Sequence, residues 1–480
     1  MAFSSLNFIC FFAILYLILW ICRGILIKNN NICLQTTKYI LLAASYIFIC
    51  LTNWRWAVYL LFITVITFVI ALLIQKNEKA KKLIMAVGVS ICILGLCFFK
   101  YFNFFIDTFN NWFGASVPFL NIAAPIGISF YTFSAIGYII DIYRGEYKVE
   151  TSFFNVAIYF SFFPKLVSGP LVGAKDFFEQ LKDYKGIKLA NLEEGIQIFA
   201  IGLFKKIVLA DHLGVFVDDV YNAPTAFSTP TVILAVISYS LQLYFDFSGY
   251  SDMAIGIAKI LGFDLCKNFN LPYISMNLTE FWKRWHISLS AWLQKYLYIS
   301  LGGNRKGKIR TYINLFLVML IGGLWHGAGW TFIAWGALHG LGLVIHKLFM
   351  NFKIRTWGDK NAGNIIWKAT SVILTYIYVA ICWVFFRADS FENAINVIKG
   401  MFVYQNGISQ IYAWSLFAIA ILLIATIVAC VKSRNNKRVD AFYPLQDLST
   451  VKGLLIFFVF VGLTICMAYF GNTAFIYGKF

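Results

Sequence analysis

One histidine has the surroundings of a reactive group. His326 lies in the run Ile321-Gly-Gly-Leu-Trp-His-Gly-Ala-Gly-Trp330, where glycines on both sides permit a helix break and the close approach of a ligand to the backbone. Sixteen residues separate it from Arg310, which is ~24 Å in a helix that rises ~1.5 Å per residue. In a hydrocarbon core of ~30 Å the imidazole lies well inside the bilayer, where an ionisable group is costly and is a candidate for function. A buried histidine bonded to a neighbouring carbonyl is the plainer alternative.

A histidine at that depth suits the removal of a proton from a hydroxyl group. A neutral imidazole with a pKa of about 6.5 accepts the proton while the hydroxyl oxygen attacks a thioester. The basic run Asn304-Arg-Lys-Gly-Lys-Ile-Arg310 is suited to holding the phosphates of an acyl donor, which makes Arg305, Lys306 and Arg310 candidate donor-binding residues. The same run also fits a loop whose positive charge only sets the membrane topology.

The other four histidines have less distinctive surroundings. His286 lies near the edge of the apolar face of a predicted amphipathic helix over residues 281–300, so it points toward the protein and is either catalytic or structural. His339 and His346 are seven residues apart on one helix face, a spacing that core packing also explains. His212 follows the end of an apolar run and is interpreted as a loop residue.

Signatures of other chemistries are missing from the sequence. It contains no H-E-x-x-H, no carboxylate at ligand spacing from His326, no C-x-x-C, no serine nucleophile elbow and no glycine-rich phosphate loop. We therefore expect no metal and no bound cofactor, with a site made of histidines alone as the alternative. The ten cysteines fall mostly in apolar runs and are interpreted as small buried hydrophobes. Asp246 and Asp252 are interpreted as helix caps or as partners of arginines.

The elements that must carry these residues are membrane helices. Of 480 residues, 60% are apolar and 13% are charged, with a mean hydropathy of +0.74, whereas soluble domains contain about 45–50% apolar and about 25% charged residues. This composition excludes a soluble enzyme. The formal net charge of +18 comes from short basic clusters between apolar runs, as in loops retained on the cytoplasmic side of a membrane, so it implies no nucleic-acid partner.

Apolar runs of near-spanning length recur along the whole chain. They predict an all-α, polytopic membrane protein with roughly 11–13 transmembrane or re-entrant helices, plus an interfacial helix over 281–300. No change in composition marks a soluble domain, so residues 1–480 are interpreted as one membrane-embedded domain. The candidate spans are 6–22, 39–51, 57–74, 83–102, 118–140, 152–170, 195–210, 231–250, 312–325, 330–346, 370–386, 411–431 and 452–470.

Basic clusters between the spans predict their orientation. If clusters such as Lys76–Lys82, Lys283–Arg310 and Lys432–Arg438 face the cytoplasm, the first span runs inward and the tail Asn472–Phe480 lies outside. The first apolar run has neither a basic segment nor a small-residue cleavage site, so it is interpreted as a retained span rather than a cleaved signal.

A series of longer motifs runs in order from about residue 125 to the C-terminus. They are Ser129-Phe-Tyr-Thr-Phe133, Phe163-Pro-Lys-Leu-Val-Ser-Gly-Pro170, Gly202-Leu-Phe-Lys-Lys206, Tyr244–Ala254, Glu280-Phe-Trp-Lys-Arg-Trp-His-Ile-Ser-Leu-Ser290, Tyr298–Asn304, Gly322-Gly-Leu-Trp-His-Gly327 and Trp383-Val-Phe-Phe-Arg-Ala388. With these motifs the sequence resembles the membrane-bound O-acyltransferase family, and in particular its bacterial branch that acetylates alginate, other exported polysaccharides and cell-wall glycans. Residues 1–120 carry no matching motif.

The resemblance implies a fold, a reaction and a location. The fold is a ring of membrane helices around funnels on both faces that a tunnel joins, in a bacterial cytoplasmic (inner) membrane. His326 corresponds to the family's catalytic histidine and His286 to its second polar position. The acyl group, expected to be acetyl, arrives on a cytoplasmic thioester such as acetyl-CoA. A polysaccharide acceptor approaches from outside, with an extracytoplasmic SGNH-type transferase or esterase as the expected partner protein and membrane lipid around the helices.

The C-terminal tail, Phe475-Ile-Tyr-Gly-Lys-Phe480, resembles the terminal F-x-Y-x-x-F motif of such export systems. There the tyrosine hydroxyl is proposed to take the acyl group and pass it to the extracellular transferase, which makes Tyr477 a third candidate catalytic residue. The branch often has Phe-Gln where Gly478 and Lys479 stand here. A terminal aromatic anchor in the membrane interface is the alternative interpretation.

Three other functions fit parts of the sequence. A related enzyme transfers D-alanine from a carrier protein to teichoic acid, but such chains are shorter and resemble this one less in its last third. A transporter without chemistry predicts an inverted repeat, and none is found in the sequence. A membrane metalloprotein is the third alternative. Acetyl transfer for glycan O-acetylation is the favoured hypothesis.

Overall fold

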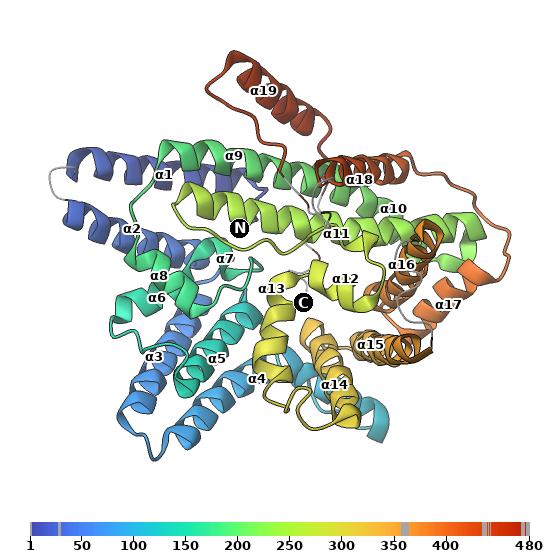
Figure 1. Cartoon of the computed structure of the whole chain (residues 1–480), viewed down its shortest axis with the longest axis horizontal. Helices are drawn as coiled ribbons and strands as arrows, with labels where there is room; N and C mark the ends of the chain where they lie inside the picture. The colour runs from blue at the N-terminus through green and yellow to red at the C-terminus, as the bar shows by residue number, and fades with distance from the viewer. Residues whose placement is uncertain are drawn as a thin grey trace. The chain divides into compact units, whose positions relative to one another are not determined.

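The computed structural model of the protein describes residues 2–26, 30–356, 364–433, 439, 441, 443–471 and 476. Helices contain 76% of the described residues, and these residues include no β-strand (Figure 1). The all-α prediction is therefore confirmed. In Figure 1 the helices follow one another from α1 in blue to α19 in red.

Nineteen α-helices and four other helical segments are found in the described part of the chain. Segments η1 and η4 are π-helices, which have wider turns than an α-helix, and η2 and η3 are 3-10 helices. The bounds are α1 Leu6–Leu26, α2 Asn30–Cys50, α3 Trp54–Lys76, α4 Lys81–Phe113, α5 Ile128–Arg144, α6 Phe153–Ser161, α7 Phe163–Leu166, α8 Ala174–Lys182, α9 Leu189–Phe204, η1 Lys205–Ala210, α10 Asp211–Asn222, η2 Pro224–Ala226, α11 Thr229–Ile260, η3 Pro272–Ile274, α12 Leu278–Arg284, α13 Ile287–Trp292, η4 Leu293–Tyr298, α14 Lys308–His326, α15 Trp330–Thr356, α16 Ile365–Arg387, α17 Phe391–Phe402, α18 Ala413–Lys432 and α19 Val451–Cys466.

Eight of these helices are long and apolar enough to cross a membrane: α1, α3, α4, α11, α14, α15, α16 and α18. Two shorter apolar stretches, Leu34–Cys50 in α2 and Val451–Cys466 in α19, add to them. Large apolar side chains are exposed on α1, α3, α4 and α18. Such side chains are stable against lipid and unfavourable in water. The chain is a multi-pass membrane protein.

Two predicted spans are divided in the structure. Residues 152–170 form α6 and the four-residue α7, because the backbone leaves the helix at Phe162 and Pro164 occupies the first turn of the next one. Residues 195–210 begin in α9 and end in the π-helical η1. Together with the shorter apolar stretches of α2, α5 and α19, these pieces explain why the structure has fewer long helices than the 11–13 transmembrane or re-entrant segments expected from the sequence.

Asparagine side chains fix where two of the helices in the second half begin. The Asn277 side chain accepts a hydrogen bond from the Glu280 N–H at 2.8 Å, at the start of α12. The Asn364 side chain accepts one from the Ile366 N–H at 2.9 Å, at the start of α16. Each oxygen satisfies an amide hydrogen that the first helical turn leaves without a partner, so these positions favour helix starts.

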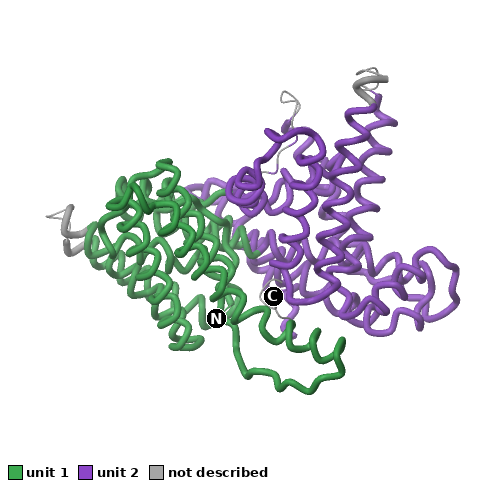
Figure 2. Tube along the Cα trace, turned by 90° about the horizontal axis from the view of Figure 1, so that it is seen from below, with its two compact units in different colours: residues 1–200, 250–266 green, residues 201–249, 267–480 purple. Residues whose placement is uncertain are grey.

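The chain divides into two compact units (Figure 2), and the boundaries fall inside α9, inside α11 and in the segment between α11 and η3. Unit 1 comprises residues 1–200 and 250–266, and unit 2 comprises residues 201–249 and 267–480. In unit 1, α3, α4 and α5 pack against one another, and α6 packs on α2 and α3. The single domain predicted over residues 1–480 stays a prediction.

Unit 2 contains all five histidines. Its helices α14 and α15 lie side by side (Figure 1) and pack closely. A Cβ atom added at Gly323 of α14 would lie 2.9 Å from the Cα atom of Gly336 in α15. Because neither position has a side chain, the two backbones touch, and the helix that ends at His326 is fixed against its neighbour.

Candidate active site

His326 is the last residue of α14 and is 3% exposed. The backbone leaves the helix at Gly327 in an extended conformation. A side chain at Gly327 would overlap the ring of Phe332 in α15. The helix break expected beside His326 is therefore present, and glycine is needed there because an aromatic ring fills the space.

His286 lies at a break between two short helices. Helix α12 ends at Arg284 and α13 begins at Ile287, so the single helix predicted over residues 281–300 is wrong. His286 has a left-handed backbone conformation, with a φ of 44°, and its side chain is fully buried. This conformation is unfavourable for a residue other than glycine, and such strain is concentrated at functional sites.

The strained turn at His286 is held by Asn268, which lies before η3 and α12 in the chain. The Ile287 N–H donates to the Asn268 carbonyl oxygen at 3.0 Å, and the Ser288 N–H donates to the Asn268 side-chain oxygen at 3.1 Å. Asn268 is itself 1% exposed. These long-range bonds replace the helical ones that the break removes, so they stabilise the turn that carries His286.

Trp325 lies between the two buried histidines. Its ring centroid is 4.8 Å from that of His326 and 6.5 Å from that of His286. Phe247 of α11 contacts the His286 ring edge-on, with 4.6 Å between the centroids. The structure thus brings together the two histidines that the sequence analysis selected from separate motifs.

Aromatic rings also surround His326 on other sides. The Trp335 ring of α15 lies 5.0 Å from it and the Phe386 ring of α16 lies 5.3 Å from it, both edge-on and measured between centroids. Such walls keep bulk water away and restrict the orientation of the imidazole. A histidine held in this way is suited to proton transfer to or from a group that enters the protein.

Burial lowers the pKa of His286, which lies outside the eight long helices, to about 3. The usual value for histidine is about 6.5, and the loss of solvation penalises the charged form. The His286 imidazole is therefore neutral at physiological pH. A neutral imidazole offers one hydrogen-bond donor and one acceptor instead of a positive charge.

His339 is fully buried in a cage of indole rings. Trp282, Trp335 and Trp383 surround it with centroid distances of 5.1, 4.9 and 5.9 Å. Neither ring nitrogen of His339 has a hydrogen-bond partner among the described residues. The contacts are those of a packed aromatic residue.

The two other histidines make different contacts. The His346 Nδ1 atom lies 3.0 Å from the Thr279 hydroxyl oxygen. His212 lies in the first turn of α10, so its interpretation as a loop residue is wrong. Its ring contacts that of Trp414 in a tilted arrangement, with 3.7 Å between the centroids. No three His, Cys, Asp or Glu side chains gather at metal-binding distance in the described residues.

The candidate donor-binding residues Arg305, Lys306 and Arg310 are exposed around the start of α14. The loop before them is held by Asn314, whose amide donates to the Gly303 carbonyl oxygen at 2.9 Å. Helix α14 places this loop and His326 at opposite ends, ~24 Å apart for Arg310 at ~1.5 Å per residue. A donor bound by its phosphates at the loop reaches His326 only through a long arm.

Tyr477 lies outside the described residues, but its neighbour Ile476 is described. The Ile476 side chain packs against the core of unit 2. Its backbone N–H donates a hydrogen bond to the Asp246 Oδ2 atom at 2.9 Å. One residue of the tail motif is therefore attached to α11.

The interpretation of Asp246 as a helix cap or a partner of an arginine is wrong. It lies in the middle of α11 and is 1% exposed, so it is no helix cap, and its charged partner is Lys206 rather than an arginine, at 2.7 Å. Lys206 also forms an ion pair with Asp211 at 2.7 Å. The available signal was the lysine within the apolar run 195–210, because a buried cation requires acidic partners.

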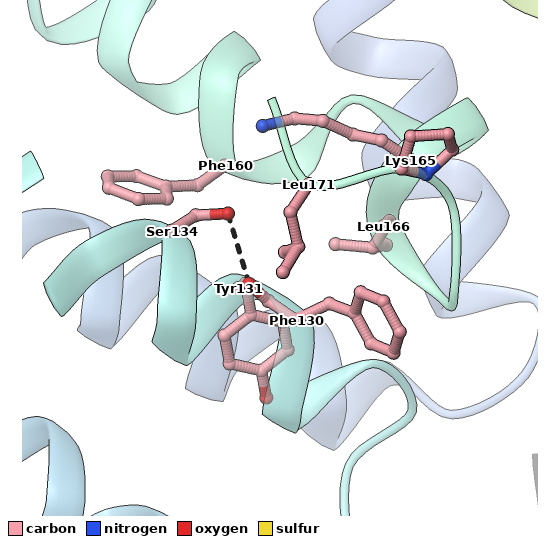
Figure 3. Close-up of a pocket in the computed structure, with 8 residues that line it drawn as sticks. Phe130, Tyr131, Ser134, Phe160, Lys165, Leu166 and Leu171 are labelled. Atoms are coloured by element: carbon pink, nitrogen blue, oxygen red, sulfur yellow. Dashed lines mark hydrogen bonds between the residues drawn. The ribbon is translucent and has the colours of Figure 1, made fainter. Parts of the chain in front are cut away.

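Unit 1 contains a small cavity beside a buried lysine (Figure 3). The Lys165 Nζ atom lies 3.6 Å from the centroid of the Tyr159 ring, a cation–π contact, and has no hydrogen-bond partner among the described residues. At the other side of the cavity the Ser134 hydroxyl donates to the Phe130 carbonyl oxygen at 3.0 Å. None of the residues predicted for catalysis lines this cavity, which is bounded by Phe130, Tyr131, Ser134, Phe160, Lys165, Leu166, Pro170 and Leu171.

Comparison with known proteins assigns the chain to a family. The model of the membrane-bound O-acyltransferase family matches residues 144–388, which include both His286 and His326. A probable alginate O-acetylase of Pseudomonas aeruginosa is 41% identical over 416 residues, which cover 84% of this chain and 75% of the relative. This chain belongs to the membrane-bound O-acyltransferase family. It is an acyltransferase, and the resemblance noted in its motifs is confirmed.

Other relatives of this membrane-bound O-acyltransferase carry two different names. The peptidoglycan O-acetyltransferase of Helicobacter pylori is 38% identical over 402 residues, which cover 78% of this chain and 75% of the relative. The teichoic acid D-alanyltransferase of Streptococcus thermophilus is 33% identical over 285 residues, which cover 54% of this chain and 68% of the relative. Similarity to the O-acetyltransferases is thus higher and extends over more of the chain.

Proposed function

We propose that this acyltransferase moves an acetyl group across the membrane for the O-acetylation of an exported or cell-wall polysaccharide. The observation that carries the proposal is the similarity, over more than three quarters of the chain, to proteins named as alginate and peptidoglycan O-acetyltransferases. Transfer of D-alanine to teichoic acid is the second candidate, favoured by a relative that aligns with little more than half of the chain.

His326 is the proposed general base. Its imidazole takes the proton of the acceptor hydroxyl while the hydroxyl oxygen attacks the thioester carbonyl carbon. The carbon–sulfur bond then breaks, and the thiolate leaves with the proton as a thiol. The step exchanges sulfur for oxygen on the acyl carbon, so it needs neither a redox partner nor a bound cofactor. The burial of His326 among aromatic rings supports this role.

His286 is the proposed second polar group of the site. Its neutral imidazole is placed by a strained turn and lies against Trp325, the residue that precedes His326. A hydrogen bond from His286 to a reacting oxygen would stabilise the charge that develops there, without the cost of a second buried cation.

The donor is proposed to be an acyl thioester, such as acetyl-CoA, that binds from the cytoplasm. Arg305, Lys306 and Arg310 are its proposed phosphate ligands. Their exposure and their place at the far end of α14 from His326 support a donor that enters from one face and extends its acyl group along the helix. The membrane is then the bacterial cytoplasmic membrane.

The acetyl group is proposed to reach its acceptor by way of the C-terminal tail. The Tyr477 hydroxyl takes the acetyl group and passes it to an extracytoplasmic SGNH-type transferase or esterase, which acts on the polysaccharide. The attachment of the neighbouring Ile476 to α11 supports a tail that is part of the catalytic unit. Residues 472–480 then face the outside of the membrane.

Radiolabelled acetyl-CoA tests the proposal in membranes from cells that express the chain. In wild type we expect label on the protein and on a co-expressed glycan. In His326→Ala the rate of acetyl transfer is expected to fall at least about 100-fold, because a positioned base contributes rate factors of that size. In Tyr477→Phe, which lacks only the hydroxyl, we expect no transfer to the glycan. His339→Phe is the matched control: it replaces a packed aromatic residue by another, so we expect activity within about threefold of wild type.

Normal activity in His326→Ala at equal protein levels would contradict the role of His326. Full activity in Tyr477→Phe would reduce the tail to an aromatic anchor. If an intact preparation uses no acetyl-CoA but accepts a D-alanyl carrier protein as donor, the function is transfer of D-alanine to teichoic acid instead of acetyl transfer.

A further inference from the structure

The C-terminal segment is fastened to unit 2 at a buried charged cluster. Lys206 of η1, Asp211 of α10 and Asp246 of α11 form this cluster, which we call the acid–lysine cluster, and all three side chains are buried. Lys206 bridges the two carboxylates. Ile476 of the tail reaches the same cluster through its backbone N–H.

The two oxygen atoms of Asp246 have different partners. Oδ1 forms the ion pair with Lys206, at 2.7 Å, and Oδ2 accepts the hydrogen bond from Ile476, at 2.9 Å. A buried carboxylate oxygen without a donor is costly, so the tail amide supplies stabilisation that Lys206 alone does not give.

A second contact fastens the chain just before the tail. The Tyr469 N–H donates to the carbonyl oxygen of Ile207, at 2.9 Å, within the π-helical η1 that also carries Lys206. The Tyr469 ring lies edge-on to His212 of α10, with 5.4 Å between the centroids. Two points of the C-terminal segment are thus attached to the surroundings of one lysine.

The same turn of α11 leads to the candidate active site. Phe247 follows Asp246 in the chain, and its ring contacts His286 at 4.6 Å. Helix α11 therefore holds the tail backbone with one residue and packs against the buried histidine with the next. The bond to Asp246 therefore holds the Ile476 backbone next to a residue that contacts His286.

We propose that the acid–lysine cluster is a binding site for the chain's own C-terminal segment, and that Asp246 is a positioning residue that presents Tyr477 for acyl transfer. Lys206 and Asp211 hold the Asp246 carboxylate in place. The consequence for transfer rests on the proposed function, in which Tyr477 receives the acyl group, whereas the docking itself does not.

Hydrogen exchange measures the docking without reference to activity. In the purified full-length protein in detergent, we expect the Ile476 amide to exchange slowly, and to exchange about tenfold faster or more in Asp246→Asn, because a charge-assisted hydrogen bond is replaced by a neutral one. Asp218→Asn is the matched control, since it neutralises a carboxylate of α10 that pairs with Arg387 and does not belong to the acid–lysine cluster. An Ile476 amide that exchanges at the free-chain rate in wild type would overturn the proposal.

A pair of tail variants links docking to transfer without altering the buried cluster. Ile476→Pro removes the N–H donor and is expected to lower transfer to the glycan about tenfold or more. Ile476→Val keeps the donor and most of the side chain that packs against the core of unit 2, so its transfer rate is expected to stay within about threefold of wild type. Equal activity of the two variants would overturn the positioning role. If Tyr477→Phe is fully active while its Ile476 amide still exchanges slowly, Tyr477 does not carry the acyl group. The docking of the C-terminal segment at the acid–lysine cluster would then remain supported.

Discussion

Proton transfer inside a membrane protein requires imidazoles that stay neutral until the substrate arrives. His286 meets this condition because burial outweighs every interaction that would favour its charged form. Its neighbours in the site are rings, Phe247 and Trp325, which offer no full negative charge to stabilise an imidazolium ion. At physiological pH the His286 imidazole can therefore both donate and accept a hydrogen bond.

The low pKa of His286 has a consequence for stability. The folded protein holds this group at about 3, whereas the unfolded chain titrates at about 6.5. Between these values the unfolded chain binds more protons, so the free energy of unfolding decreases as the pH falls below 6.5. We expect it to decrease by about 2 kcal/mol more in wild type than in His286→Asn between pH 7 and pH 4.5, as measured by denaturant unfolding in detergent.

Asparagine is the suitable replacement at this position because it tolerates the left-handed backbone that residue 286 adopts with a φ of 44°. His286→Val serves as the comparison: a β-branched side chain is strained there, and the variant is expected to be less stable than His286→Asn at pH 7. Identical pH dependence in wild type and His286→Asn would show that another group causes the loss of stability in acid.

At the scale of the helices, the contact between α14 and α15 fixes His326. The contact is made by glycines, Gly323 on one helix and Gly336 on the other, whose Cα atoms leave no space for a methyl group. Adjacent Gly322 has space: a Cβ atom there would find its nearest neighbour, a methyl group of Leu293, at 3.7 Å. Of these two neighbouring glycines, only Gly323 is required by the close contact with α15.

This difference predicts opposite results for two single-methyl changes. Gly323→Ala forces the helices apart and is expected to lower the free energy of unfolding by about 1–3 kcal/mol, together with a loss of acyl transfer, because His326 moves with α14. Gly322→Ala is expected to be neutral or to stabilise by up to about 1 kcal/mol, since alanine favours a helix. Thermal unfolding and transfer rates on matched membrane preparations check both. Equal effects of the two changes would contradict the close contact as the reason for Gly323.

At the scale of the whole molecule, the proposed reaction connects a basic surface to a buried base. The exposed residues Arg305 and Lys306 lie near the start of α14, and His326 lies at its end. In the proposed reaction, charge at the loop affects how the donor binds and leaves the chemical step untouched. A measurement of KM and kcat can therefore distinguish donor binding from a role in topology alone.

Reversing the charges of Arg305 and Lys306 tests whether these residues bind the acyl donor. Arg305→Glu with Lys306→Glu is expected to raise the KM for acetyl-CoA about tenfold or more with little change in kcat, because the lost interaction is the same in the ground state and the transition state. The control is Lys79→Glu, between α3 and α4, with Lys82→Glu, in the first turn of α4; both lysines are exposed, and the double change should leave KM unchanged. An unchanged KM in the loop variant at equal protein level would limit Arg305 and Lys306 to setting topology.

The sequence by itself determined the helical membrane architecture, the family and the candidate histidines. These properties depend on local chemistry: apolar runs must form helices in lipid, and the glycines around His326 permit the helix to end there. The basic residues before α14 were also visible in the sequence, because they form a cluster between two apolar runs.

Only the tertiary structure decided how distant segments meet. The break at His286 was missed because its strain is offset by Asn268, through hydrogen bonds that no periodicity of residues 281–300 reveals. The partner of Asp246 was assigned to the wrong residue type, since Lys206 lies far away in sequence and reaches α11 only through the fold. A buried charge indicates that a partner exists, but the identity of that partner is set by long-range packing.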